Sequence, residues 1–274
     1  MSSPPSADLS GRVALVTGAN HGIGAATARL LGAGGAAVLL SYLRLDEPPD
    51  EGTPESYRLN RAAAADDVVT AIAREGGRAS SIEVDLADPA GPVSLFDAAE
   101  RHFGPVDILV NNASAWLADT FKPATTDRLG RALQPVSAAS FDRQFAVDAR
   151  GGALLIAEFA RRHVMRAASW GRIVGLTSGG PFGFPEEVSY GAAKAALENY
   201  TMSAASELAG LGVTANIVYP PVTDTGWITE EVRRSVKASD ELVGVAHPEE
   251  VAEVIAWLAS DGARLVTGNI IRLR

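Results

Sequence analysis

Short apolar segments alternate with stretches of helical composition along nearly the whole of this 274-residue chain. The first apolar segment, VALVT at 13–17, is too short for a helix and is bounded by glycine, so it predicts a buried strand. Strands that alternate with helices are typical of a parallel sheet with both faces covered. The predicted strands are 13–17, 36–41, 78–85, 107–114, 171–178, 213–220 and a last strand within 267–273.

Six helices are predicted between these strands, over 22–33, 61–75, 92–103, 139–168, 188–210 and 248–260. No linker divides the chain, and no short repeat is visible. The prediction is therefore an α/β protein with a single doubly wound parallel sheet in one domain, 1–274. Polar or proline-containing segments near 44–60, 115–138 and 223–246 are expected to be irregular insertions.

Composition excludes several classes of function. The net charge is −9 and no basic stripe is present, which argues against a nucleic-acid partner. The chain has no cysteine, so disulfides, thiolate metal sites and cysteine nucleophiles are excluded, and no metal site is predicted. We expect no secretory signal in the polar N-terminus and no membrane span in the short apolar runs. We expect a cytoplasmic protein.

A glycine-rich turn, TGANHGIGAA, follows the first predicted strand and opens the first predicted helix. Parallel sheets of this kind bind ligands at the carboxyl ends of their strands. Glycines at such a turn let the backbone approach a pyrophosphate, which the helix N-terminus attracts. The turn therefore predicts a Rossmann-type dinucleotide site, and the alternative is a glycine-rich turn without a ligand. The residues expected at the cofactor are Gly18, Asn20, His21, Gly22, Ile23 and Gly24.

The spacing of these glycines, Gly-x-x-x-Gly-x-Gly after a threonine, resembles the classical short-chain dehydrogenase/reductase family. Later motifs of that family follow in order, each at the end of a predicted strand, and the match covers nearly the whole chain. By this resemblance the cofactor contacts include Asp85, Leu86, Asn112, Ala113, Ser114, Pro220, Val222 and Thr225. Ser114 stands where the family has glycine, and Pro221 stands where it has glycine after the sixth strand.

The resemblance also implies a catalytic set of Ser178, Tyr190 and Lys194. Tyr190 and Lys194 lie four residues apart on a predicted helix, so they share one face. An ammonium near a phenol favours the phenolate and lowers its pKa, so Tyr190 would act as general acid or base tuned by Lys194. Ser178 would position the substrate oxygen, and Lys194 would also contact the cofactor ribose. The alternative is an ordinary surface pair.

Asp148 stands where the family usually has an asparagine that holds a water of the proton relay. An ionised Asp148 near Lys194 would stabilise the ammonium and partly cancel its effect on Tyr190. We expect Asp148 to belong to a functional but retuned relay. The alternative is a solvated aspartate on a helix.

The end of the second predicted strand bears on the choice of cofactor. NAD-selective relatives tend to carry an acidic residue there, but here Tyr42 stands at that point, with Ser41 and Arg44 beside it. His21 would add positive character. NADP(H) is therefore favoured, and NAD(H) remains an alternative because Asp46 and Glu47 follow closely.

The expected function is an NADP(H)-dependent oxidoreductase that interconverts a carbonyl and a secondary alcohol of a small molecule. One candidate is a 3-oxoacyl-ACP reductase, for which seven arginines could form a basic rim: Arg128, Arg131, Arg161, Arg162, Arg166, Arg233 and Arg234. Alternatives are an NAD(H)-dependent sugar or alcohol dehydrogenase and a catalytically silent dinucleotide-binding sensor. An apolar pocket with a mobile lid is expected from Trp116, Leu117, Phe121, Trp227 and Ile228. By resemblance we expect a homotetramer or a homodimer.

Overall fold

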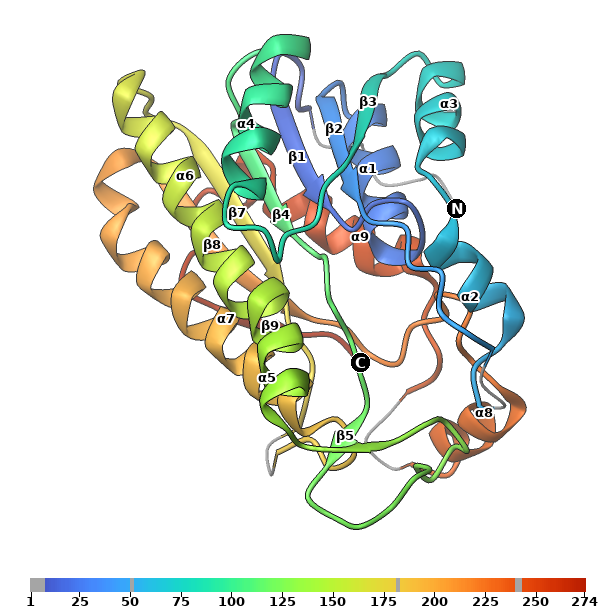
Figure 1. Cartoon of the computed structure of the whole chain (residues 1–274). Helices are drawn as coiled ribbons and strands as arrows, with labels where there is room; N and C mark the ends of the chain where they lie inside the picture. The colour runs from blue at the N-terminus through green and yellow to red at the C-terminus, as the bar shows by residue number, and fades with distance from the viewer. Residues whose placement is uncertain (1–7, 50–51, 181–182, 240–242) are drawn as a thin grey trace.

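The computed structural model describes residues 8–49, 52–180, 183–239 and 243–274. A seven-stranded sheet forms the centre of the fold, and all its neighbouring strands are parallel (Figure 1). The strands are β1 (Val13–Thr17), β2 (Ala37–Tyr42), β3 (Arg78–Glu83), β4 (Ile108–Asn111), β7 (Gly171–Leu176), β8 (Val213–Tyr219) and β9 (Ile270–Arg272). Their spatial order is β3-β2-β1-β4-β7-β8-β9. The predicted doubly wound sheet is confirmed.

Helices cover both faces of this sheet (Figure 1). One layer holds α1 (Gly22–Ala33), α3 (Asp66–Arg74) and α9 (Pro248–Leu258), and the other holds α4 (Gly91–His102), α6 (Gly152–Met165) and α7 (Val188–Glu207). The side chains of β1 show how one strand serves two cores. Ala14 and Val16 belong to the first apolar cluster, whereas Val13 and Leu15 belong to the second. A strand buried on both faces reads as a continuous apolar run, as VALVT does.

The order of the strands reverses at β1, which pairs with β2 on one side and with β4 on the other. Connections that leave the two neighbouring strands in opposite directions open a crevice at their carboxyl ends. This crevice is where the glycine-rich turn after β1 and the residues after β4 meet, so the topology places the ligand site there.

Two predicted helices are divided in the structure. The predicted helix 61–75 corresponds to α3 and to the end of a separate helix, α2 (Glu55–Ala62), most of which lies in the segment 44–60 that was expected to be irregular. The Asn20 amide donates to the carbonyls of Asn60 and Ala63 where α2 ends. The predicted helix 139–168 is α5 (Ala138–Phe145), a π-helical turn, η1 (Ala146–Gly151), and then α6. Gly151 and Gly152 lie at that junction, and glycine weakens a regular helix by about 1 kcal/mol relative to alanine.

The segments expected to be irregular contain short elements. Strands β5 (Asp119–Thr120) and β6 (Gln134–Pro135) pair within 115–138, and α8 (Glu230–Lys237) lies within 223–246. The Asp119 carboxylate is fully buried and accepts hydrogen bonds from the Ser189 N–H at 2.8 Å and from its hydroxyl at 2.5 Å. Asp119 thereby provides an acceptor for a backbone N–H group in the first turn of α7. The segment 115–138 is therefore bonded to the start of α7, and its expected role in a mobile lid stays a prediction.

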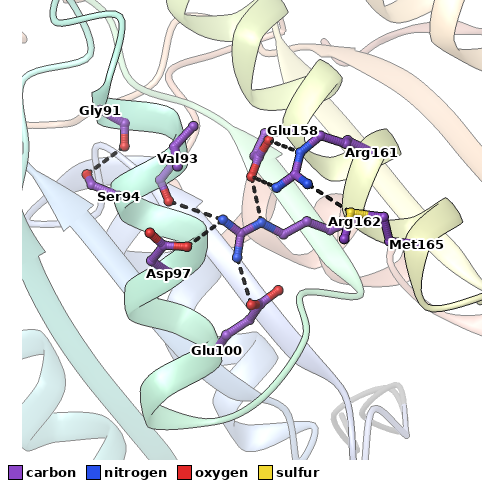
Figure 2. A network of polar contacts seen from close by, with 9 residues as sticks. All are labelled: Gly91, Val93, Ser94, Asp97, Glu100, Glu158, Arg161, Arg162 and Met165. Atoms are coloured by element: carbon purple, nitrogen blue, oxygen red, sulfur yellow. Dashed lines mark hydrogen bonds and ion pairs between the residues drawn. The ribbon is translucent and has the colours of Figure 1, made fainter.

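A charged network joins α4 to α6 (Figure 2). Arg162 on α6 is bonded to Glu158 on the same helix at 2.6 Å and to Asp97 and Glu100 on α4 at 2.6 and 2.7 Å. Arg161 also donates to Glu158. The hydrogen bonds from Arg161 and Arg162 lower the pKa of Glu158 to about 2.

In the described ranges no helix has the length and apolar character needed to cross a membrane.

Candidate active site

A cavity of about 740 Å³ opens at the carboxyl ends of the central strands. The glycine-rich turn, the residues after β2, β3, β4, β7 and β8, and the start of α7 all contribute to its walls. Most of the predicted site residues line this single cavity: Gly18, Asn20, His21, Gly22, Ile23, Ser41, Tyr42, Asp85, Leu86, Asn112, Ala113, Ser114, Ser178, Tyr190, Pro220, Val222 and Thr225. Four others, Gly24, Arg44, Asp148 and Lys194, lie outside its lining.

The glycine turn has the shape that a pyrophosphate requires. Gly18 and Gly22 have positive φ angles of 62° and 56°, which favour glycine. A Cβ atom on Gly22 would lie 2.8 Å from the Thr225 Cγ2 atom, so any larger residue at this position would collide with the Thr225 side chain. His21 precedes α1 without a side-chain cap, and the first turn of that helix carries no acidic residue. The backbone N–H groups at this helix start can therefore bind a phosphate.

Asn112 holds the glycine turn against β4. Its side-chain amide donates to the carbonyls of Thr17 at 2.9 Å and Gly18 at 2.8 Å. The Thr17 hydroxyl accepts from the backbone N–H groups of Asn112 and Ala113. Gly24 packs directly against these groups, and a Cβ atom there would collide with the Gly18 carbonyl and with the Asn112 amide. Asn112 and Gly24 thus fix the shape of the turn.

Ser178 and Tyr190 both lie on the wall of the cavity. Ser178 follows β7, and Tyr190 lies in the first turn of α7. Burial raises the pKa of Tyr190 well above its ordinary value, and the negative charges of Asp148 and Glu187 raise it further. The net shift is therefore opposite in direction to the one expected from Lys194 alone, and the phenol is protonated at neutral pH.

Asp148 and Lys194 form a buried ion pair, with 2.9 Å between Oδ1 and Nζ. Their side chains are 0% and 2% exposed, so the alternative of a solvated aspartate is wrong. The other carboxylate oxygen accepts from the Gln144 amide at 2.6 Å and from the Ala115 N–H at 3.0 Å. The Lys194 ammonium is 5.7 Å from the centre of the Tyr190 ring. A carboxylate therefore compensates the cation that was expected to act on the phenol.

The adenosine end of the cavity differs from the expectation in two respects. Arg44 makes a bidentate pair with Glu83, with a shortest distance of 2.7 Å, and lies outside the cavity lining. Burial and the nearby Arg61 cation lower the pKa of His21 to about 4, so His21 is neutral at pH 7 and adds no positive charge. Arg61 on α2 does line the cavity and pairs with Glu47 at 2.6 Å.

Tyr57, Arg131 and Glu187 are cavity residues that were not among the predicted cofactor or catalytic residues. Arg131 bridges Asp127 and Glu187 at 2.6 and 2.7 Å and lies near the rings of Trp116 and Trp227. These residues come from three segments far apart in the sequence. No local sequence pattern predicts such a cluster, because the segments come together only in the folded protein.

A family model described as enoyl-(acyl carrier protein) reductase matches residues 18–273. The chain belongs to the short-chain dehydrogenase/reductase family. Among family members, the cis-4-hydroxycyclohexanecarboxylate dehydrogenase of Sinomonas cyclohexanicum is 38% identical, over 95% of this chain and 94% of that protein. The versicolorin reductase of Emericella nidulans is 33% identical, over 99% and 97%. The angucycline C-6 ketoreductase LanV, solved with bound NADP, is 31% identical with a TM-score of 0.79, over 97% and 95%.

The family assignment confirms the predicted type of enzyme. The protein is an NAD(P)-dependent oxidoreductase of the short-chain dehydrogenase/reductase family that acts on a carbonyl or an alcohol. By their names, two of these relatives are a versicolorin reductase and an angucycline ketoreductase, and the third is a dehydrogenase of cis-4-hydroxycyclohexanecarboxylate.

Proposed function

We propose that this protein is an NADP(H)-dependent oxidoreductase that interconverts a ring ketone and its secondary alcohol. Ser178 and Tyr190 carry the proposal, because both lie on the wall of a cavity that Trp116 and Trp227 also line. Aromatic walls suit a flat or cyclic substrate, because they stack on it without requiring directed polar contacts. The ring substrates in the names of the relatives support the same substrate class.

The residues of the cavity fit a nicotinamide dinucleotide. The uncapped start of α1, at Gly22 and Ile23, would hold the pyrophosphate. Asp85 and Leu86 would flank the adenine, Ser41, Tyr42 and Arg61 would surround the adenosine ribose and its phosphate, and Ala113, Ser114, Pro220, Val222 and Thr225 would hold the nicotinamide half. When bound, the nicotinamide supplies or accepts the hydride. The relative LanV binds NADP, and a neutral Tyr42 in place of a carboxylate favours the 2′-phosphate form here.

Side chains of the protein bind the substrate oxygen and transfer its proton. Ser178 donates a hydrogen bond to the substrate oxygen and fixes its position. Tyr190 gives its proton to the carbonyl oxygen during reduction and takes a proton from the alcohol during oxidation. The raised pKa of Tyr190 keeps the phenol protonated at neutral pH, so it can donate a proton during reduction. Lys194 would lie against the cofactor ribose, with Asp148 as its counter-ion, so the pair positions the relay and limits the charge that acts on Tyr190.

The alternative of a 3-oxoacyl-ACP reductase has less support. An acidic carrier protein requires a basic rim, but five of the seven arginines considered for it are paired with carboxylates. Arg131, Arg161, Arg162, Arg166 and Arg233 make ion pairs of 2.6–2.9 Å. A silent sensor is less favoured because Ser178 and Tyr190 both lie on the wall of the cavity that would hold the cofactor. A homotetramer or homodimer and a cytoplasmic location stay predictions.

Turnover of a panel of ketones tests this function. The purified protein should oxidise NADPH in the presence of ring ketones such as 1-tetralone and 4-methylcyclohexanone, and NADH should support a lower kcat/KM. A thermal-shift titration should show that NADP(H) raises the melting temperature more than NAD(H), because a ligand that binds only the folded state stabilises it. Cofactor binding without turnover of any carbonyl or alcohol would instead support the sensor.

A further inference from the structure

A carboxylate lies between two guanidinium groups of the cavity wall. One oxygen of Glu47 accepts a hydrogen bond from Arg61 at 2.6 Å, and the other accepts one from Arg143 at 2.7 Å. Both arginines line the main cavity and also a neighbouring cavity of about 450 Å³, whereas Glu47 lines only the neighbouring one. Within the described ranges neither arginine makes another ion pair, so one carboxylate compensates two cations.

The glycine-rich turn fixes the position of Arg61. The Asn20 amide in that turn donates to the carbonyls of Asn60 and Ala63, on either side of Arg61, at 3.2 and 2.9 Å. The Arg61 side chain is only 8% exposed, and its guanidinium carbon lies 5.7 Å from the centre of the Tyr57 ring. A buried cation is therefore held beside the turn at which the pyrophosphate is expected, where the adenosine half of a dinucleotide also begins.

Glu47 belongs to the segment that follows β2. The Leu45 N–H donates to the Arg61 carbonyl at 3.0 Å, so this segment runs along the end of α2. Arg143 lies on α5, and about half of its side chain is exposed. In folds of this kind the residues after the second strand recognise the adenosine ribose and any 2′-phosphate on it. The carboxylate and both guanidinium groups therefore belong to the part of the site in which NAD(H) and NADP(H) differ.

A phosphate suits these two arginines better than the carboxylate does. Guanidinium groups bind phosphate oxygens through paired, charge-assisted hydrogen bonds. A 2′-phosphate carries more negative charge than one carboxylate, so two cations attract it more strongly. The Glu47 side chain is 37% exposed and can turn towards solvent when it leaves the arginines. NAD(H) has no 2′-phosphate, so Glu47 keeps both ion pairs in that complex and competes with NADP(H) alone.

We propose that Glu47 is a specificity-determining residue that occupies, in the free protein, the site of the cofactor's 2′-phosphate between Arg61 and Arg143. The phosphate displaces the carboxylate on binding, so Glu47 reduces the preference for NADP(H) that the two arginines create. The inference rests on the proposed use of NADP(H) and names the residue that limits its strength.

The affinities of NADPH and NADH test the proposal, because these cofactors differ only in the 2′-phosphate. Isothermal titration calorimetry in a buffer free of phosphate and sulfate gives the ratio of the NADH Kd to the NADPH Kd. E47Q should raise this ratio at least about tenfold, through tighter binding of NADPH. The isosteric amide keeps the shape of the side chain and leaves both cations to the phosphate. If Glu47 only held its segment in place, E47Q would instead weaken both cofactors.

Substitution of the arginines should have the opposite effect. R61M should lower the ratio about tenfold, because it removes the buried cation. R143M should lower it about threefold, since this guanidinium is half exposed and its charge is screened by water. If R61M fails to fold, R143M still supplies the opposite sign. About 0.5 M sodium chloride should reduce the effect of E47Q, because salt screens the charges.

D46N is the matched control, since it removes an equal charge one residue away. Asp46 is 91% exposed, and its nearest cation is Arg58 at 3.9 Å. Its ratio should change by less than about threefold. An unchanged or lower ratio in E47Q, or equal tightening of both cofactors, would overturn the proposal.

Failure of the proposed function gives different results, because affinity is measured without turnover. A wild type that binds NADPH but reduces no ring ketone contradicts the proposed function alone. A wild type that binds NADH at least as tightly as NADPH contradicts the proposed use of NADP(H), and the ratio in E47Q still decides the role of Glu47. No binding of NADPH by the wild type and by E47Q would overturn both.

Discussion

Replacement of Asp148 by asparagine should lower the pKa of Tyr190. In the structure Asp148 raises that pKa directly and also compensates the Lys194 ammonium at 2.9 Å. The variant D148N removes the carboxylate charge and leaves the ammonium 5.7 Å from the centre of the Tyr190 ring. With an effective dielectric constant of about 20, a unit charge at that separation stabilises the phenolate by about 3 kcal/mol, or about two pKa units.

The assay is the pH dependence of kcat/KM for the reduction of 1-tetralone by NADPH. Reduction requires the protonated phenol, so activity is lost as the pH rises through the pKa of Tyr190. Because burial raises this pKa in the wild type, its reduction profile should stay flat far into the alkaline range. D148N should show an alkaline decline about two pH units below that of the wild type, and the alcohol oxidation profile should reach its plateau at a correspondingly lower pH.

E198Q serves as the matched control. It makes the same carboxylate-to-amide change one helical turn beyond Lys194, at a residue that accepts a hydrogen bond from the Thr177 hydroxyl. Glu198 is not among the main groups that raise the pKa of Tyr190, so the E198Q profile should stay close to that of the wild type. Superimposable pH profiles of wild type and D148N, with both proteins folded, would refute the view that Asp148 sets the acidity of the phenol.

Three further predictions concern the cofactor and stability. R61M should reduce the melting-temperature rise caused by NADPH more than that caused by NADH, because Arg61 is a cation of the cavity beside His21; equal reductions would contradict a phosphate contact. D119A should lower the free energy of unfolding in urea by about 2 kcal/mol, since it removes a charged acceptor from the start of α7; a change within experimental error would show that the cap contributes nothing. Glu158 has a folded-state pKa of about 2 against an ordinary value of 4.5, so its contribution to stability is complete above pH 4.5 and is lost as the pH falls towards 2; E158Q should therefore unfold in acid with a weaker pH dependence than the wild type, and identical acid curves would be the contrary result.

The sheet could be predicted because its strands are buried on both faces. A strand such as β1 must be apolar at every position, and its boundaries with glycine are visible in the sequence. The seven predicted strands agree with the structure to within a few residues at each end. The glycine turn was equally visible, because Gly18 and Gly22 adopt positive φ angles that other residues rarely adopt.

The electrostatics of the site could not be predicted from the same patterns. The spacing of Tyr190 and Lys194 indicated that they share a helical face, but it did not show which charge is nearer to the phenol. Asp148 reaches Lys194 only because η1 packs against α7. His21 was expected to add positive charge, yet its burial next to Arg61 keeps it neutral. Such effects depend on desolvation and on partners distant in sequence.

The insertions were the least predictable part of the chain. Polar and proline-rich composition indicated irregular segments, and it concealed the short helices α2 and α8. The bond between Asp119 and Ser189 and the pair between Arg131 and Glu187 both join the segment 115–138 to the start of α7. Neither pairing has a local sequence signal, because each links residues more than fifty positions apart.

The central claim, that the Tyr190 phenol supplies the proton to the substrate oxygen, is tested most directly by single-turnover reduction in Y190F. The substitution removes one hydroxyl and keeps the ring, so the protein should still bind NADPH with the wild-type thermal shift. We predict that the rate of NADPH oxidation on mixing with 1-tetralone falls at least about a thousandfold, in the range expected for loss of a general acid. A Y190F protein that binds NADPH and reduces the ketone within about tenfold of the wild-type rate would contradict the account.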